Sequence, residues 1–326
     1  MKALVLGAGI GSRLRPESEV VPKPLWPVLG IAQIEWVLKR LRKAGVCEVI
    51  INLCHLGEKI ENHLKSKDFG INISFSKEKE ILGTLGALLA PQVKQFFEGE
   101  NVFLVHNADI FLDFDLRMLF DFHQANGGIA TMLFCKGEKE DVCEVSGGKL
   151  ISIRGVPEYK GGERFVFSGV SVQTSEVYRR FKKGIKGCLV KDYILPMLKE
   201  GKEVFALVAK DGLFFDIGTK ENYLALNKML LPRAKEVFLS AGFEPPRAID
   251  DGVFVFGNPR IEKGAKIFAP ALICDRAIVE NGASVGPYCV VCDEAVVPKG
   301  TVVQESVVFP KAVAWSGAHA IMLSST

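Results

Sequence analysis

The sequence lacks any long apolar run and any dense cluster of basic residues. No stretch approaches the roughly 18 consecutive apolar residues that a membrane-spanning helix needs. The apolar run from Ala3 to Leu6 is soon interrupted by glycines and then by Arg13 and Arg15, a pattern that disfavours a signal peptide. The formal net charge is only +3, so any basic surface is expected to be local and directed at phosphate. We therefore expect a cytoplasmic protein with no membrane or nucleic-acid partner.

Cysteine and histidine are also too sparse for an evident disulfide or zinc framework. The eight cysteines lie in apolar contexts and lack the dense spacing of a small disulfide-rich domain. Cys289 and Cys292 form a single C-x-x-C pair, but the only downstream histidine is His319. We expect structural thiols. His63 and His123 fall in helical segments, where we expect them at the surface.

Through residue 230, the sequence alternates short apolar runs with amphipathic segments. Apolar residues recur on one face of 31–44, which predicts a helix ending near Gly45. Strands separated by helices predict a Rossmann-like, mostly parallel sheet with helices on both faces. The segment VCEVSGGKLISI predicts a hairpin around Gly147–Gly148. The predicted strands are 2–6, 47–53, 71–75, 101–106, 129–135, 165–172 and 204–209.

From Val255 onwards the sequence has a period of six. Large apolar residues recur at every sixth position, and a small residue stands two positions before many of them. The row consists of Val255, Ile261, Ile267, Ile273, Val279, Val285, Val291, Val297 and Val303, continued by Phe309. This period predicts a left-handed hexapeptide β-helix, in which each hexad forms one short face; a β-sandwich with chance spacing is the alternative. Residues 250–310 hold no histidine that could act as an acyltransferase base, so we expect the coil to orient the catalytic domain or to build a homo-oligomer.

A glycine-rich turn follows the first predicted strand directly, with the sequence GAGIGSRLRP over 7–16. Glycines allow the backbone to turn tightly, and successive N–H groups can form a cradle for an anion. A dinucleotide-binding turn would lead into a helix and place an acidic residue about 20 residues later, and a P-loop would contain G-x-x-x-x-G-K-[ST]. Neither pattern is present.

Two basic residues after these glycines suit a triphosphate. Arg13 stands two residues past the last glycine, and Lys23 is held between Pro22 and Pro24. An arginine offers a planar fork to the leaving pyrophosphate, whereas a lysine gives a point charge near the α-phosphate. The prolines restrict the loop and so preorganise the lysine. A solvated basic loop is the alternative.

These motifs resemble the N-terminal signature of the sugar-1-phosphate nucleotidylyltransferases, also called nucleotide-sugar pyrophosphorylases. Further motifs follow in the order typical of that family. They are LGTLGAL at 82–88, HNAD at 106–109, FSGV at 167–170 and DIGT at 216–219. The addition of a hexapeptide coil looks most like mannose-1-phosphate guanylyltransferases and glucose-1-phosphate nucleotidylyltransferases.

The resemblance implies a role for each matching residue. The implied catalytic residues are Arg13, Lys23 and Asp109. The implied nucleotide-binding residues are Leu6, Gly7, Ala8, Gly9, Gly11, Ser12, Arg13, Lys23, Gly83 and Thr84. The implied sugar-phosphate-binding residues are Asn107, Lys160, Ser168, Gly169 and Lys191.

Asp109 and Asp216 are the predicted ligands of Mg²⁺. Asp109 ends the apolar strand NVFLVH, and Asp216 follows the apolar segment 213–215. Sheets of this class bind ligands beyond the carboxyl ends of their strands, and Mg²⁺ prefers hard oxygen ligands. Such a metal would offset charge that builds up on the α-phosphoryl oxygens. For either aspartate alone, a turn or a helix cap is the alternative.

Three positions depart from the family pattern. Ala108 replaces the usual glycine. The common Glu-Lys-Pro is not intact, so Lys160 in the segment VPEYK is the nearest candidate. Lys191 stands where many relatives carry a glutamate. These changes leave the reaction class in place and the identity of the sugar open.

The prediction is therefore Mg²⁺-dependent transfer of a nucleoside monophosphate from an NTP to a sugar 1-phosphate, with GTP and mannose 1-phosphate favoured. One alternative is a UTP- or dTTP-dependent enzyme for glucose 1-phosphate or an N-acetylated amino sugar 1-phosphate. Another is a regulatory subunit that senses nucleotide-sugars without turnover. The predicted domains are a catalytic domain at 1–232, a linker at 233–250, the β-helix at 251–310 and a tail or cap at 311–326.

Overall fold

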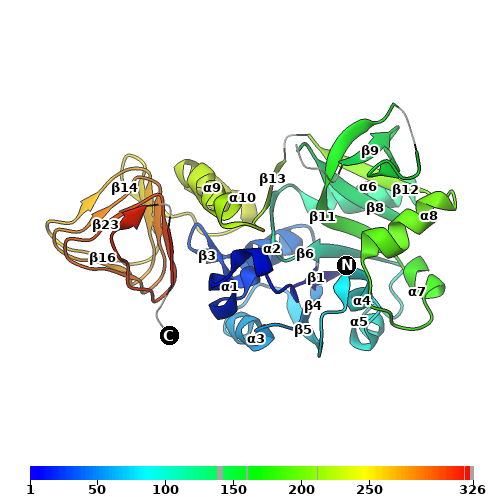
Figure 1. The fold of residues 1–326 in the computed structure, drawn as a ribbon, viewed down its shortest axis with the longest axis horizontal. Coiled ribbons are helices and arrows are strands. Elements are labelled where there is room, and N and C mark those ends of the chain that lie inside the picture. The colour runs from blue at the N-terminus through cyan, green and yellow to red at the C-terminus, as the bar shows by residue number, and fades with distance from the viewer. Residues whose placement is uncertain (138–141, 159–160, 211, 319, 324–326) are drawn as a thin grey trace. The chain divides into compact units, whose positions relative to one another are not determined.

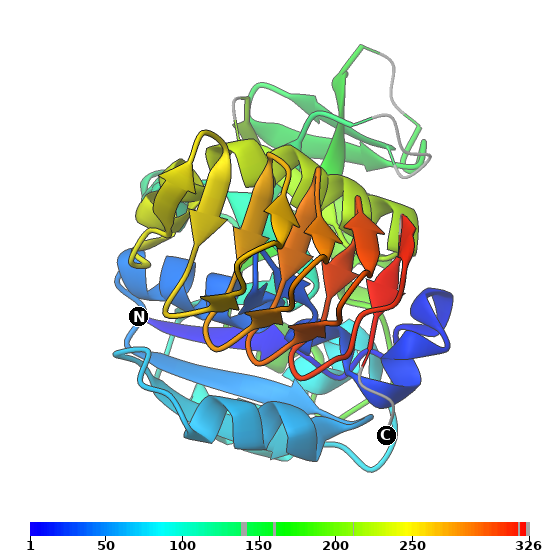
Figure 2. The same cartoon turned by 90° about the vertical axis from the view of Figure 1, so that its left-hand side faces the viewer.

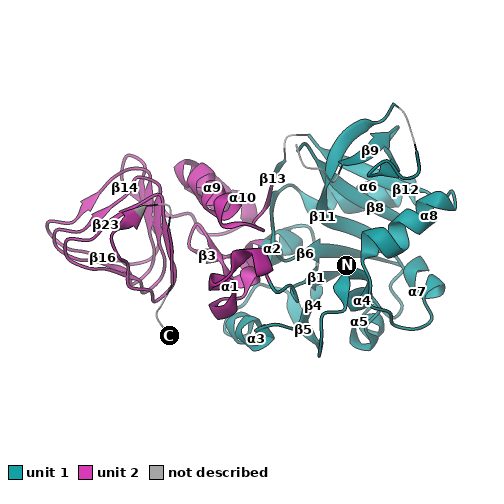
Figure 3. Ribbon diagram, viewed as in Figure 1, with its two compact units in different colours: residues 1–10, 37–214 teal, residues 11–36, 215–326 magenta. Residues whose placement is uncertain are grey.

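A computed structural model describes most of the chain, as two compact units. The described residues are 1–137, 142–158, 161–210, 212–318 and 320–323. Unit 1 comprises residues 1–10 and 37–214, and unit 2 comprises residues 11–36 and 215–326 (Figure 3). This division differs from the predicted domains, because residues 11–36 belong to the same unit as the C-terminal residues. No helix in the described ranges is long and apolar enough to cross a membrane.

Unit 1 contains a sheet with the strand order β5-β4-β1-β6-β11-β8-β12-β10-β9 (Figure 1). Its strands are β1 (Lys2–Leu6), β4 (Glu48–Leu53), β5 (Asn72–Lys77), β6 (Val102–Asn107), β8 (Ala130–Cys135), β9 (Val142–Ser146), β10 (Lys149–Ile153), β11 (Glu163–Thr174) and β12 (Val204–Ala209). All the strands predicted from the sequence are present. The predicted hairpin is confirmed too, since β9 and β10 pair around Gly147 and Gly148, which both have positive φ.

The prediction of a mostly parallel sheet is confirmed only in part, because the sheet is mixed. Strands β5, β4, β1 and β6 are parallel neighbours, but β11 runs antiparallel to both β6 and β8. A parallel connection needs a crossover, usually a helix. Between β8 and β11 the described chain contains the β9–β10 hairpin and no helix. Strand β11 therefore returns antiparallel to its neighbours.

Both faces of the sheet are covered in unit 1. Successive strand residues point to opposite faces, and Ala3, Leu4 and Val5 of β1 are all fully buried. On one face, Leu4 packs in a cluster with Leu85 of α4 and Val93 of α5. The helices of this part are α2 (Gln33–Lys43, which begins in unit 2), α3 (Gly57–Lys65), α4 (Gly83–Leu88), α5 (Pro91–Phe96), α6 (Leu116–Asn126), α7 (Glu176–Arg180), a π-helix (Leu189–Ile194) and α8 (Leu195–Lys199), with the short strand β7 (Ile110–Asp113).

Unit 2 begins at Gly11, within the glycine-rich turn, and resumes within β13. Its elements before the coil are α1 (Glu17–Val20), β2 (Pro27–Val28), β3 (Ile31–Ala32), β13 (Leu213–Asp216, which begins in unit 1), α9 (Lys220–Leu230), α10 (Ala234–Ala241) and β14 (Arg247–Asp250). The segment 233–250, predicted as a linker, thus contains α10 and β14. Helix α10 forms because Val237, Phe238 and Ala241 lie on one buried face.

Residues 253–318 and 320–322 form three sheets of parallel strands, here called the coil (Figure 2). The first sheet has β15 (Val253–Val255), β18 (Ala271–Ile273), β21 (Cys289–Val291), β24 (Val307–Val308) and β26 (Ile321–Met322), with β14 antiparallel at its edge. The second has β16 (Arg260–Ile261), β19 (Ile278–Val279) and β22 (Val296–Val297). The third has β17 (Lys266–Ile267), β20 (Ser284–Val285), β23 (Val302–Gln304) and β25 (Gly317–Ala318).

The predicted six-residue period describes the register of the coil up to Val303. Val255 pairs with Ile273, and Ile273 pairs with Val291, so three hexads separate stacked residues. Val291 then pairs with Val308 and not with Phe309, so the predicted place of Phe309 is wrong by one residue. The expected tail from 311 onwards also differs, because it contributes β25 and β26 to the last turn.

Candidate functional site

Unit 2 brings together three of the four charged residues that the sequence predicts at a triphosphate site. Lys23 begins a short helical turn after Pro22, and its side chain is only 8% exposed. Its Nζ lies 3.5 Å from Oδ1 of Asp216, and Nη2 of Arg13 lies 4.0 Å from Oδ2 of the same carboxylate. A lysine is rarely buried unless its charge is paired. The arrangement is therefore a cationic site built around one carboxylate.

Backbone conformation explains why the glycines flank this cluster. Gly11 has φ of 67°, and its carbonyl accepts a hydrogen bond from Ser18 Oγ at 2.9 Å. Ser12 then begins the turn that carries Arg13. At Gly218, a Cβ would lie 2.5 Å from Arg13 Nη2, so the arginine side chain passes over a position with no side chain.

The residues that follow Lys23 anchor it to the rest of unit 2. Trp26 is fully buried, and its ring lies 4.9 Å from that of Tyr223 on α9 and 5.6 Å from that of Phe309 in the coil. The Tyr223 hydroxyl donates to the carbonyl of Pro27 at 2.6 Å. Edge-to-face aromatic pairs favour one defined arrangement. The aromatic packing that holds the chain next to Lys23 thus includes a residue of the coil, Phe309.

In unit 1, the end of β6 carries the predicted sugar-phosphate residue Asn107 and the predicted metal ligand Asp109. The amide of Ala108 donates to the carbonyl of Leu6 at 3.0 Å, which fixes this turn to β1. Gly169 has φ of 79°, and a Cβ there would lie 2.8 Å from Asn107 Nδ2. Ser168 is fully buried, with its hydroxyl accepting from the amide of Val170 at 3.3 Å. The Asn107 side chain therefore packs directly on the backbone of the FSGV segment.

His106 lies just before this turn and is buried. Its Nδ1 lies 2.8 Å from the carbonyl of Asn107, so Nδ1 carries the proton, and Nε2 has no hydrogen-bond partner among the described residues. Burial, together with the charge of Arg40, lowers the pKa of His106 to about 4. The imidazole is thus neutral near pH 7. The expectation that His123 lies at the surface is wrong: it is buried, and its Nδ1 contacts Thr131 Oγ1 at 2.9 Å.

The buried neutral His106 predicts that stability falls on acidification. The unfolded chain binds a proton at His106 near pH 6.5, whereas the folded chain does so only near the lowered pKa of about 4. Stability is therefore complete above pH 6.5 and is lost as the pH falls toward 4. We expect urea unfolding to give about 2 kcal/mol less stability at pH 5 than at pH 7.5 from this group. In His106→Leu, the difference in unfolding free energy between pH 7.5 and pH 5 should shrink by that amount. An unchanged difference would contradict a buried, neutral His106.

The segment 82–88, which contains the predicted nucleotide-binding residues Gly83 and Thr84, is hydrogen-bonded to a second segment of unit 1. A Cβ at Gly83 would overlap the carbonyl oxygen of Gly187, which accepts from the amide of Leu85 at 2.9 Å. Thr84 Oγ1 accepts from the amide of Leu189 at 2.7 Å. The π-helix that carries Lys191 starts at Leu189. These hydrogen bonds therefore connect the predicted nucleotide-binding residues to the helix that carries a predicted sugar-phosphate-binding residue.

A second polar connection reaches the same segment from the glycine-rich turn. The amide of Gly7 donates to Asn52 Oδ1 at 2.9 Å, and Asn52 Nδ2 donates to Glu78 Oε1 at 2.8 Å. The other oxygen of Glu78 accepts from the amide of Leu82 at 3.3 Å. Burial raises the pKa of Glu78, although the bonds from Asn52 and Leu82 oppose that shift. No motif in the sequence predicts this connection, because Gly7, Asn52 and Glu78 are far apart along the chain.

The remaining predicted site residues lie as follows. Ala8 is buried, while Gly9 is exposed and has open space where a Cβ would stand. Lys160 lies outside the described residues. Asp109 belongs to unit 1 and Asp216 to unit 2, and each is described within its own unit. The paired role of these two aspartates therefore stays a prediction.

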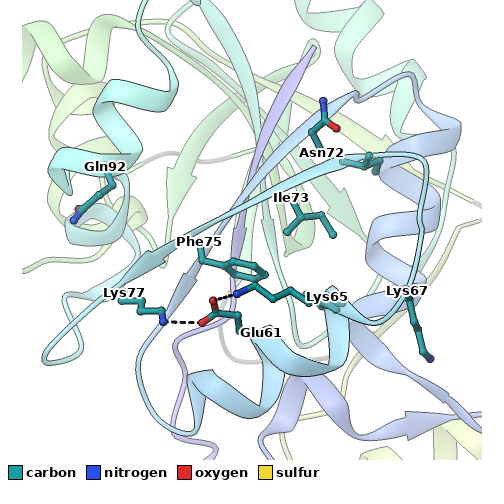
Figure 4. Close-up of a pocket in the computed structure, with 10 residues that line it drawn as sticks. Glu61, Lys65, Lys67, Asn72, Ile73, Phe75, Lys77 and Gln92 are labelled. Carbon is teal, nitrogen blue, oxygen red and sulfur yellow. Dashed lines mark hydrogen bonds and ion pairs between the residues drawn. The ribbon is translucent and has the colours of Figure 1, made fainter.

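A cavity of about 640 Å³ in unit 1 involves none of the predicted site residues. It lies against the edge strand β5, where Phe75 and Ile73 face it (Figure 4). Lys65 and Lys77 pair with Glu61 at its rim, at 2.7 and 2.8 Å. Lysines are a common protection of an exposed sheet edge against pairing with another chain. We assign this cavity no role in the chemistry.

A family model described as nucleotidyl transferase matches residues 2–232. The chain belongs to the nucleotidyl transferase family. This result confirms the enzyme class to which the motifs point. The match spans residues of both compact units. It therefore includes Arg13, Lys23 and Asp216 as well as the turn after β6.

Two relatives show the breadth of this nucleotidyl transferase family. The chain is 28% identical over 318 residues to a UTP–glucose-1-phosphate uridylyltransferase of Synechocystis sp., covering 86% of this chain and 81% of that protein. It is 28% identical over 276 residues to a mannose-1-phosphate guanyltransferase of Saccharomyces cerevisiae, covering 82% and 73% respectively. The crystal structure of HddC from Yersinia pseudotuberculosis shares the fold, with 21% identity, a TM-score of 0.58 and coverage of 70% of this chain and 99% of that chain.

Proposed function

We propose that this nucleotidyl transferase moves a nucleoside monophosphate from an NTP to a sugar 1-phosphate and releases pyrophosphate. The observation that carries the proposal is the buried Lys23, whose Nζ lies 3.5 Å from Asp216 beside the exposed Arg13. Both relatives named above are enzymes whose names specify a sugar 1-phosphate. GTP and mannose 1-phosphate are the favoured pair, with UTP or dTTP and glucose 1-phosphate or an N-acetylated amino sugar 1-phosphate as alternatives.

The proposed chemistry is an in-line displacement at the α-phosphorus. An oxygen of the sugar phosphate forms the new P–O bond, while the bond between the α-phosphorus and the bridging oxygen breaks and pyrophosphate leaves. A phosphate monoester is already mostly ionised at pH 7, so no general base is required. Arg13 would bind the departing pyrophosphate through its planar fork, and Lys23 would hold the α-phosphate. Catalysis then depends on positioning and on fixed charge.

Magnesium is the proposed cofactor, and Asp109 and Asp216 are the proposed ligands. The donor chemistry fits, because each residue offers hard carboxylate oxygens of the kind that Mg²⁺ prefers. Asp216 also faces the two cations that are proposed to bind the phosphates. When bound, the metal would offset negative charge on the phosphoryl oxygens.

The sugar phosphate is proposed to lie against Asn107, Ser168 and Gly169, with Lys160 and Lys191 as candidate phosphate contacts. The close packing of Gly169 on the Asn107 side chain supports this placement, since it fixes the amide at the end of β6. The nucleotide is proposed to contact the glycine-rich turn and the residues Gly83 and Thr84.

A matrix of substrates tests this proposal. ATP, GTP, UTP, CTP and dTTP are each combined with the 1-phosphates of mannose, glucose and N-acetylglucosamine, and released pyrophosphate is measured. We expect release only when Mg²⁺ and both substrates are present, with one pair dominating. A regulatory subunit would instead bind nucleotide-sugars and release no pyrophosphate from any pair.

We also propose that the coil is a left-handed hexapeptide β-helix through which copies of the chain associate. The three parallel sheets and the 18-residue register of their paired strands support the first part. Phe268, Val302 and Trp315 support the second, because they are large apolar residues of the coil that are 43–51% exposed. Light scattering should give a multiple of the 35.7 kDa chain mass. A monomer mass at micromolar concentration would contradict the association.

A further inference from the structure

The connection from Gly7 through Asn52 and Glu78 to Leu82 is a polar network of unit 1 that the proposed chemistry does not use. It is made of contacts between segments that are distant in sequence, since Gly7 and Asn52 are 45 residues apart and Asn52 and Glu78 are 26 apart. Asn52 is only 4% exposed, and a Cβ at Gly7 would make a tight contact of 3.1 Å with the carbonyl oxygen of Asn52. A buried network of this kind is costly unless all its groups are bonded.

The chemistry of the groups fixes the direction of every hydrogen bond. The amide of Gly7 can only donate, so the atom of Asn52 that faces it must be the oxygen. Asn52 Nδ2 then donates to one oxygen of Glu78, and the amide of Leu82 donates to the other. Glu78 must therefore accept twice, which suits a carboxylate and neither an amide nor a protonated acid.

The two ends of the network are both segments proposed to hold the nucleotide. Gly7 opens the glycine-rich turn, and Leu82 precedes Gly83 and Thr84. We infer that Asn52 and Glu78 are positioning residues that hold the glycine-rich turn and the nucleotide-binding segment 82–88 at the spacing that the NTP requires. This inference rests on the proposed function. It assigns the pair to NTP binding and not to the chemical step or to the sugar phosphate.

A charge-swap series tests the inference. In Glu78→Gln, one accepting oxygen becomes an NH₂ group that must face another donor, either the Leu82 amide or Asn52 Nδ2. We expect the KM for GTP to rise about tenfold, with kcat and the KM for mannose 1-phosphate changed by less than about twofold. In Asn52→Asp, two carboxylates face each other, and we expect a similar rise.

The double variant Asn52→Asp/Glu78→Gln restores every hydrogen bond with the charge moved by one residue. The introduced aspartate would accept from the Gly7 amide and from the side-chain amide of the introduced glutamine, whose oxygen accepts from Leu82. We expect its KM for GTP to return to within about threefold of the wild-type value. A merely structural role would lower the melting temperature of the single variants and leave their KM for GTP unchanged. That result, or a double variant as impaired as the singles, would overturn the inference.

Failure of the inference can be told apart from failure of the proposed function. Wild-type turnover in the same assay tests the function alone. If the wild-type protein releases no pyrophosphate, mant-labelled GTP, UTP and dTTP are screened by fluorescence, and the one that the wild-type protein binds is used for the same series. Weaker binding in each single variant and recovery in the double variant would support the positioning role, and equal binding in all four proteins would overturn it.

Discussion

Asp109→Asn is expected to lower kcat by about 100- to 1000-fold, with little change in folding. The substitution keeps the size of the side chain and removes the negative charge proposed to hold Mg²⁺. Loss of metal-based charge stabilisation costs several kcal/mol in the transition state, and each 1.4 kcal/mol is a factor of about ten in rate. Pyrophosphate release at saturating substrates measures the effect. Raising the Mg²⁺ concentration should recover part of the activity, because the weakened site is filled by mass action.

Asp115→Asn is the matched control for that variant. Asp115 lies in the same part of unit 1 and caps α6 by accepting from the amide of Arg117 at 2.9 Å. Asparagine caps a helix about as well as aspartate, so we expect wild-type activity and stability. Near-normal turnover in Asp109→Asn would refute the assignment of Asp109 to the metal.

Ile273→Asp is expected to unfold the coil or to lower its stability by about 3–5 kcal/mol. Ile273 is fully buried and is stacked between Val255 and Val291. An aspartate there would place an uncompensated charge against the apolar side chains of the neighbouring turns. Thermal unfolding followed by circular dichroism measures the effect. Because the coil also packs on Trp26, we expect the folded fraction of the variant to show reduced turnover as well.

Val313→Asp is the control for the coil, since it makes the same kind of change at a position that is 56% exposed and is not among the residues proposed for association. We expect a change of no more than about 0.5 kcal/mol, because surface substitutions seldom exceed that size. Melting of Ile273→Asp at the wild-type temperature would contradict the stacked interior.

The fold was predictable wherever the signal is local. Most strands of unit 1 are short apolar runs or alternate apolar with polar residues, and many hexads of the coil repeat the same small and large positions. The step from Val291 to Val308 was not predictable, because Val307, Val308 and Phe309 are all apolar and all buried. A period of six cannot decide which of three adjacent apolar residues faces inward.

The site was predictable to a similar extent. Arg13, Lys23 and Asp216 were predicted because they belong to short motifs with distinctive residue types, and unit 2 brings them together. Asn52 and Glu78 were missed because their partners are distant in sequence. The one hint was an asparagine that ends the apolar run from Val49 to Ile51 at the carboxyl end of a strand.

The most direct test of the account is to follow the label from two forms of GTP. The protein is incubated with Mg²⁺, mannose 1-phosphate and GTP labelled with ³²P on either the α- or the γ-phosphate, and the products are separated by chromatography. Nucleotidyl transfer predicts that the α-label enters the sugar nucleotide and that the γ-label leaves in pyrophosphate. Entry of the γ-label into the sugar product would show phosphoryl transfer instead and would contradict the account.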